Sequence, residues 1–313
     1  MIRDNTPILV TGAPRSGTTF LGRMLSLPPY VGYVDEPFNQ QTGIVDIRRD
    51  FLYIPDDDPS LHDFYDPAIK KLLAGRSTYR ASTLPDRDQS QAKQLARGLF
   101  TSRTALAYRF QGINPLVTRP LIKDPIASFS AQYLHRRQGM QVVIIMRHPA
   151  SNVASFKRLG WYFNLRDLTG QPDLMNRYLQ PVLGNLDLDK LTDVETWSYF
   201  WLATYTALTA FIRDNPGMIL VKHESLSRQP LVEFERLYAE LHLPFTPAVR
   251  KRLLAHTRSG NPVTAPPRVA HALKRDSAQA VLSWKKILTA PEVDTIRQIT
   301  SPVSDAYYAG ADW

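Results

Sequence analysis

The chain has 313 residues, of which 43% are hydrophobic and 21% are charged, and it contains no cysteine. This composition is typical of a globular protein with a substantial apolar core, and it excludes disulfides, cysteine-ligated zinc and thiol nucleophiles. The formal net charge of +9 favours an anionic partner, but the basic residues are scattered along the chain, which argues against nucleic-acid binding.

The apolar runs are short. None approaches the length of about 20 residues that a membrane span needs, and the first residues contain no apolar stretch of signal-peptide length. We therefore expect a cytoplasmic protein without a membrane span. No heptad or exposed apolar stripe indicates an oligomeric state.

The first elements alternate between strand and helix. Residues 8–11 predict a strand, and apolar residues at helical spacing from Gly17 predict a helix that Pro28 ends. Residues 31–34 predict a second strand. The segment from about 40 to 116 is rich in Asp, Pro, Ser, Gln and Arg, and we interpret it as an insertion over the active face.

The alternation resumes in the second half of the chain. Strands are predicted at residues 120–123, 141–146 and 218–222, and the second of them is apolar from Val142 onward, which favours a place at the centre of the sheet. A second loop-rich insertion covers about 160 to 192. The longest predicted helix has a stripe of large apolar residues that we interpret as core: Trp197, Trp201, Tyr205, Leu208 and Ile212. The pattern predicts a three-layer α/β fold, a central parallel sheet flanked by helices, in one domain over 1–313.

Residues 11–19 lie between the first predicted strand and helix, which is the context of a phosphate-binding loop. Gly12 and Gly17 have the Walker A spacing, but Thr18 stands where that motif has Lys, and the cation comes earlier, as Arg15. Such a loop suits ATP poorly, yet it offers backbone N–H groups, a helix dipole and an Arg fork to a dianion. We therefore expect a fold of the P-loop type.

The string Pro14 to Thr19 resembles the 5′-phosphosulfate loop, Pro-Arg/Lys-Ser-Gly-Thr-Thr, of sulfotransferases that use 3′-phosphoadenosine 5′-phosphosulfate (PAPS). The second signature of that family is an Arg at the end of a central strand and a Ser eight residues later, both binding the 3′-phosphate, and Arg147 and Ser155 match it. The resemblance implies that these residues bind the donor: Arg15, Ser16, Gly17, Thr18, Thr19, Arg147 and Ser155.

The resemblance also implies catalytic residues. Lys123, in the string Ile-Lys-Asp-Pro, is similar to the Lys of tyrosylprotein sulfotransferases that stabilises charge around the transferring group, a role shared here with Arg15. Pro125 stands where cytosolic small-molecule sulfotransferases have a catalytic His, so the general base must come from elsewhere. Glu36 lies at the same distance from the loop as the catalytic Glu of tyrosylprotein sulfotransferases, and we expect it to be the base. Three residues are alternatives for this role: Asp35, His148 and His135.

Two weaker matches concern the rest of the donor. Val221 to Leu226 resembles a family stretch near the adenine, with His223 in place of a Tyr, where it either stacks on the base or packs in the core. Residues 275–277, ending in Ser277, and the pair Trp284-Lys285 resemble elements that close over the donor in bacterial members.

The implied reaction is in-line transfer of a sulfuryl group from PAPS to an acceptor hydroxyl, leaving adenosine 3′,5′-bisphosphate (PAP), with no required metal. Glu36-Pro37 favours a glycan or another small-molecule alcohol as the acceptor. The alternatives are a P-loop kinase or nucleotide hydrolase, and a nucleotide-binding protein without sulfotransfer activity. Aromatic residues of the two insertions either line the acceptor pocket or form the insertions' own core: Phe51, Tyr53, Phe64, Tyr65, Trp161, Tyr162 and Phe163.

Overall fold

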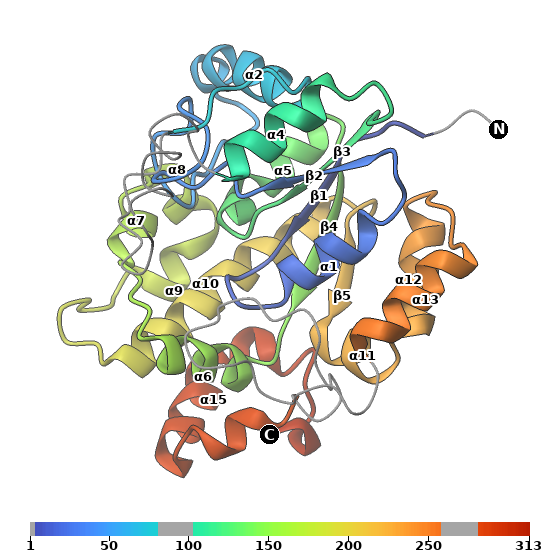
Figure 1. Cartoon of the computed structure of the whole chain (residues 1–313). Coiled ribbons are helices and arrows are strands. Elements are labelled where there is room, and N and C mark those ends of the chain that lie inside the picture. The colour runs from blue at the N-terminus through green and yellow to red at the C-terminus, as the bar shows by residue number, and fades with distance from the viewer. Residues whose placement is uncertain (1–3, 81–102, 258–280) are drawn as a thin grey trace, which may run out of the picture.

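The computed structural model describes residues 4–80, 103–257 and 281–313. A parallel sheet of five strands lies at its centre, in the order β2-β3-β1-β4-β5 (Figure 1). The strands are β1 (Ile8–Thr11), β2 (Val31–Asp35), β3 (Arg119–Lys123), β4 (Gln141–Met146) and β5 (Ile219–Lys222). All five expected strands are present, and their carboxyl ends meet at one edge of the sheet because every pairing is parallel.

One expectation about the sheet is wrong. The middle strand is β1, and β4, which was expected at the centre, is the next strand along. Alternate residues of β4 enter two different hydrophobic clusters, Val142 and Ile144 one of them and Val143 and Ile145 the other. Its continuous apolar run therefore indicates that both faces of the strand are buried. Every interior strand of such a sheet is buried in this way, so the run does not predict which of them is in the middle.

Helices cover both faces of the sheet and give the three layers that the sequence predicts. One face carries α1 (Thr18–Leu25), α12 (Pro230–Glu240) and α13 (Pro247–Thr257), whose buried residues share a cluster with Ile8 and Val10 (Figure 1). The other face carries α5 (Ala131–Arg136), α6 (Pro149–Leu159), α10 (Asp193–Asp214) and α15 (Ala290–Ser304), packed around Leu9 and Ile122. A short helix, α11 (His223–Arg228), follows β5 directly.

The long helix α10 begins at a capping box. The Thr192 hydroxyl accepts from Glu195 N at 3.3 Å, and the Glu195 carboxylate accepts from Thr192 N at 2.8 Å. From there the predicted stripe runs into the core, with Trp201 and Tyr205 both 0% exposed. None of the helices in the described ranges is both long and apolar enough to cross a membrane.

The two predicted insertions pack against each other. The first contains α2 (Pro59–Leu73) and α4 (Arg103–Ile113), and the second consists of short pieces: α7 (Arg166–Thr169), α8 (Pro172–Leu174), a π-helical turn at Met175–Leu179 and α9 (Gln180–Leu183). The Gln171 side chain joins them, because its Oε1 accepts from Tyr53 N at 2.8 Å and its Nε2 donates to Phe51 O at 3.0 Å. Residues 81–102 of the first insertion lie outside the described residues.

Candidate active site

The loop after β1 has backbone angles that require glycine at two positions. Gly12 and Gly17 have φ values of 145° and 107°, which strongly favour glycine. A Cβ on Gly12 would lie 2.2 Å from the carbonyl oxygen of Ile145, and a Cβ on Gly17 would lie 2.8 Å from His223 Cδ2. Arg15 also has a left-handed backbone, with φ of 68°. The loop therefore lies tightly against the end of β4 and directs the start of α1 into the space above the sheet.

Tyr205 of α10 holds this loop from below. Its hydroxyl oxygen accepts a hydrogen bond from Ala13 N at 3.2 Å and donates one to Ile145 O at 2.9 Å. Burial raises the pKa of Tyr205 far above its ordinary value, so the hydroxyl keeps the proton that the second bond needs. One buried side chain thus joins the loop to the neighbouring strand. The sequence interpretation missed this role because the position falls in an apolar stripe.

Two further contacts fix the loop and its arginine. Asn152 Nδ2 on α6 donates to Pro14 O at 2.9 Å, and Arg147 Nη1 donates to Arg15 O at 3.0 Å. Trp201 Nε1 in turn donates to the carbonyl of Arg147 at 2.9 Å. The sequence analysis predicted neither the contact of Asn152 with the loop nor that of Trp201 with Arg147. The polar atoms at the ends of these side chains distinguish them from purely apolar core residues, and that is the signal that could have found them.

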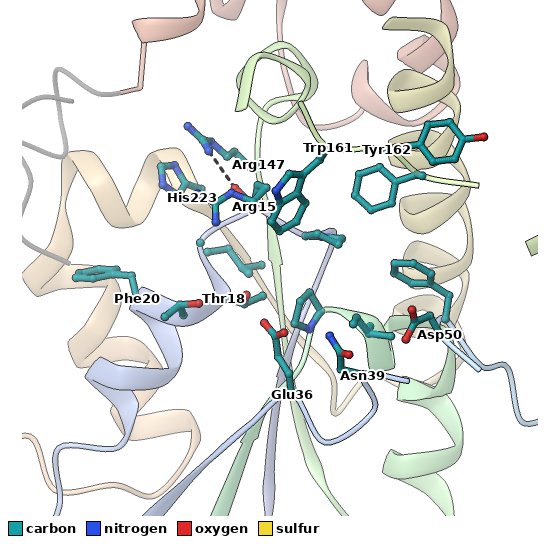
Figure 2. A pocket seen from close by; sticks show the side chains of 18 of the residues that line it. Arg15, Thr18, Phe20, Glu36, Asn39, Asp50, Arg147, Trp161, Tyr162 and His223 are labelled. Carbon is teal, nitrogen blue, oxygen red and sulfur yellow. Dashed lines mark hydrogen bonds between the residues drawn. The ribbon is translucent and has the colours of Figure 1, made fainter. Parts of the chain in front are cut away.

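The predicted donor-binding cations lie close together. Arg15 Nε donates to Ser155 Oγ at 3.3 Å, and the Arg15 guanidinium lies 5.5 Å from the centre of the Trp161 ring. Figure 2 shows Arg15, Arg147 and His223 gathered at one end of a pocket. Two arginines beside the start of a helix form a strongly anion-binding arrangement, because the helix dipole and unpaired N–H groups add to the two charges.

Lys123 and Glu36 meet where β3 and β2 end. Lys123 Nζ lies 2.5 Å from Glu36 Oε1 and 2.7 Å from Asp35 Oδ1, and its side chain is only 2% exposed. Burial would lower the pKa of Lys123, but the attraction of the two carboxylates outweighs it and the pKa is raised. Lys123 is therefore a charged group that holds two acidic side chains at the carboxyl edge of the sheet.

The backbone around Glu36 is held by Asp124. Its carboxylate accepts from Phe38 N at 2.6 Å and from Ile126 N at 2.9 Å, and burial raises its pKa to about 8. Glu36 itself has a left-handed φ of 44°, and its N–H donates to Lys123 O at 2.9 Å. These bonds fix the direction in which the Glu36 side chain leaves the strand end.

A cavity of about 320 Å³ lies over this edge of the sheet. The predicted site residues that line it are Arg15, Gly17, Thr18, Thr19, Glu36, Arg147 and His223. Three predicted site residues are buried and do not line the cavity: Ser16, Lys123 and Ser155. Lys123 contacts the lining residue Glu36, and Ser155 contacts the lining residue Arg15. Ser277 lies outside the described residues.

The alternative bases and the matched C-terminal pair lie elsewhere. His148 is enclosed by the rings of Trp284, Tyr308 and Trp313, and burial lowers its pKa to about 4. Its neighbour Trp284 stacks on it and does not line the cavity. His135, on α5, donates from Nδ1 to Met140 O at 2.9 Å and does not line the cavity.

Asp35 is held by Lys123 and by the Tyr33 hydroxyl, which donates to it at 3.1 Å. Of the described carboxylates and histidines that were considered as bases, Glu36 is the one that lines the cavity. No group of three or more His, Asp or Glu side chains in the described ranges is arranged to hold a metal ion.

A sequence model of the sulfotransferase family matches residues 7–247. The chain belongs to the sulfotransferase family. The match extends from the start of the first strand, through both insertions, to the first residue of α13. Comparison of this sulfotransferase with curated proteins gives no match.

Three solved structures are similar to this sulfotransferase. The sulfotransferase domain from the curacin biosynthetic pathway is 16% identical, with 96% of this chain and 98% of that chain covered and a TM-score of 0.48. Sulfotransferase STF9 from Mycobacterium avium is 15% identical, with 97% and 77% covered and a TM-score of 0.45. Retinol dehydratase in a complex with retinol and PAP is 13% identical, with 96% and 82% covered and a TM-score of 0.46. The family assignment rests on the sequence match.

Proposed function

We propose that this chain transfers a sulfuryl group from PAPS to the hydroxyl of a glycan or another small-molecule alcohol. The observation that carries the proposal is that an anion-binding loop, two arginines and the carboxylate of Glu36 line a single cavity in a member of the sulfotransferase family. The loop lacks the Lys of nucleoside triphosphatases and has Thr18 in its place, which disfavours the kinase alternative.

The loop end of the cavity fits the donor. The first N–H groups of α1 and the Arg15 guanidinium would hold the 5′-phosphosulfate. Arg147, supported by the hydroxyl of Ser155, would hold the 3′-phosphate, and its planar fork suits a dianion better than an ammonium group. Ser16, a buried residue, closes the turn below through its N–H, which donates to Ala13 O at 3.1 Å, and His223 beside Gly17 would contact the adenine.

The proposed step is a single in-line displacement. PAPS supplies an activated sulfuryl group, whose bond to the bridging phosphate oxygen breaks as a bond from sulfur to the acceptor oxygen forms. Glu36 takes the proton of the acceptor hydroxyl. Arg15 balances the negative charge that builds on the departing phosphate oxygen of PAP.

Lys123 has a role that depends on Glu36. In the resting site its ammonium group is neutralised by Glu36 and Asp35. The three groups together carry a net charge of −1 in that state, and once Glu36 accepts a proton the cluster becomes neutral. Proton uptake by the base would therefore increase the positive potential at the reacting group when charge builds on the leaving oxygen.

The donor site is tested by thermal stability, since a ligand that binds the folded state raises the melting temperature. We expect PAP to stabilise the chain equally with and without EDTA, and ATP with Mg²⁺ to stabilise it less. Stabilisation by ATP with Mg²⁺ alone would favour a kinase. No stabilisation by either ligand would favour a protein without sulfotransfer activity.

The proposal also covers the extent of the domain, the cellular compartment and the need for a metal ion. We place residues 1–313 in one sulfotransferase domain, with the two insertions on the acceptor side, and we place the enzyme in the cytoplasm. The transfer needs no metal ion, which the EDTA arm of the experiment tests directly.

A further inference from the structure

The cavity has two chemically different ends (Figure 2). Arg15 and Arg147 lie at the donor end, and Glu36 lies between the ends. Figure 2 shows Asp50 of the first insertion on the other side of Glu36, and Asp167 of the second insertion also lines the cavity, near enough to Asp50 to raise its pKa. The cavity thus changes from positive to negative along its length, and the negative end is the one left for the acceptor once the donor is in place.

An aromatic wall runs from Trp161, whose ring centre lies 5.5 Å from the Arg15 guanidinium, to Phe51 beside Asp50, and it is an observation independent of the carboxylates. The Phe51 ring is held rigidly, with its centre 5.0 Å from that of Phe200. Trp161 stacks on Phe156 with ring centres 6.3 Å apart, and its carbonyl accepts from Trp197 Nε1 at 2.8 Å. Trp161 and Phe51 both line the cavity. Fixed ring faces in a cavity bind a flat apolar or ring-shaped group at little entropic cost.

The two carboxylates at this end differ in their contacts from Asp35 and Glu36, which share Lys123. Asp50 accepts from Gln40 N at 2.7 Å, and Arg49 donates to the backbone carbonyl of Asp167 and not to its side chain. Over the described part of the chain, neither carboxylate forms a salt bridge. Burial raises the pKa of Asp50, and the charges of Asp167 and Glu36 raise it further, while the hydrogen bond from Gln40 and the charge of Arg80 offset this only in part. A positive group in the cavity would relieve this repulsion.

We propose that the acceptor is an alcohol that carries both a ring face and a protonated amine. The ring packs on Trp161 and Phe51, the ammonium group lies against Asp50 and Asp167, and the hydroxyl meets Glu36. Carboxylates and aromatic faces together select an ammonium group, through charge-assisted hydrogen bonds and cation–π attraction. The proposal rests on the proposed function, because it assigns only the acceptor end of the same cavity.

A matched pair of probes tests the charge requirement. 4-(Aminomethyl)benzyl alcohol and 4-(acetamidomethyl)benzyl alcohol share the ring and the hydroxyl, but only the first is cationic at neutral pH. Isothermal titration calorimetry of each probe into PAP-saturated protein should show the amine binding at least roughly tenfold tighter, as expected for hydrogen bonds to charged groups. In the double variant D50N/D167N this ratio should fall toward one. In Asp63→Asn, an exposed carboxylate on α2, it should not change.

The outcomes separate the two proposals. If PAP binds but the acetamide probe binds as well as the amine, if neither probe binds, or if D50N/D167N keeps the preference, the amine requirement is wrong and the donor assignment stands. If PAP itself fails to bind, the proposed function is overturned, and this inference with it.

Discussion

Lys123 Nζ lies 2.5 Å from Glu36 Oε1 although the two residues are 87 positions apart in the chain. They meet because β2 and β3 are parallel neighbours, with Asp35 in register with Lys123, so that both side chains lie where the strands end. This contact places the proposed base beside a cation that burial fixes in position.

Replacement of Glu36 by Gln removes the proton acceptor and keeps the shape of the side chain. We expect turnover to fall ~10²–10⁴-fold, with PAP affinity little changed, because Glu36 lies outside the donor end that Arg15 and Arg147 form. Transfer from radiolabelled PAPS and a PAP titration measure the two effects. Full activity of Glu36→Gln would show that another group takes the proton.

Arg147→Lys should weaken PAP binding more than binding of AMP. The guanidinium is proposed to hold the 3′-phosphate, which AMP lacks, and an ammonium group cannot reproduce its paired bonds. We expect the ratio of PAP to AMP affinity to fall roughly tenfold or more. An unchanged ratio in calorimetric titrations would place the 3′-phosphate elsewhere.

Tyr205→Phe should impair donor binding at a modest cost in stability. The variant leaves Ala13 N and Ile145 O without their shared partner, and loss of such buried bonds costs about 1–3 kcal/mol. Because Ala13 belongs to the loop, we expect a higher KM for PAPS as well as a lower melting temperature.

Tyr238→Phe is the matched control for that prediction. Tyr238 is also fully buried, and its hydroxyl donates to Met24 O at 2.6 Å, away from the residues that line the cavity. It should lower the melting temperature and leave the KM for PAPS unchanged. Equal KM effects in both variants would mean that Tyr205 acts only through general stability.

His148 should make the fold sensitive to acid. Burial lowers its pKa from 6.5 to about 4, so between these values the unfolded chain binds a proton that the folded chain does not. Stability therefore falls as the pH drops from 6.5 toward 4. Relative to His148→Phe, the wild type should lose roughly 3 kcal/mol of unfolding free energy by pH 4.

Denaturant unfolding at several pH values measures this difference. His256→Gln is the control: it changes a histidine on α13 whose Nδ1 donates to Arg252 O at 2.8 Å within the same helix, and it should follow the wild-type profile. Parallel profiles for the wild type and His148→Phe would show that His148 takes up its proton equally in the folded and unfolded chains.

The features of the fold and the site that depend on local sequence patterns are the ones that the sequence predicts. Five apolar runs give five parallel strands, and a parallel sheet brings the ends of strands together, which is why Glu36, Lys123 and Arg147 lie at one edge. The order of the strands cannot be predicted in this way, because β1 and β4 are both covered on two faces and only β1 is in the middle.

The rest of the site depends on long-range packing. Tyr205 has the helical spacing and burial of a core residue, and its contact with the loop arises only when α10 lies under β4. Asp50 and Asp167 face one cavity because of the path of two irregular segments, and no periodicity encodes such a path. These residues become visible only in three dimensions.

The Gln171 side chain, which joins the two insertions, has a consequence for how acceptor selectivity can change. Tyr53 N and Phe51 O both bond to this one amide. Replacing the second segment alone leaves buried backbone of the first unsatisfied, and replacing the first alone puts the partners of the Gln171 amide at risk. A graft of acceptor preference from a related enzyme would therefore have to exchange residues 40–80 and 160–192 as a pair. Single-segment chimaeras would lose folding before they revealed any new specificity.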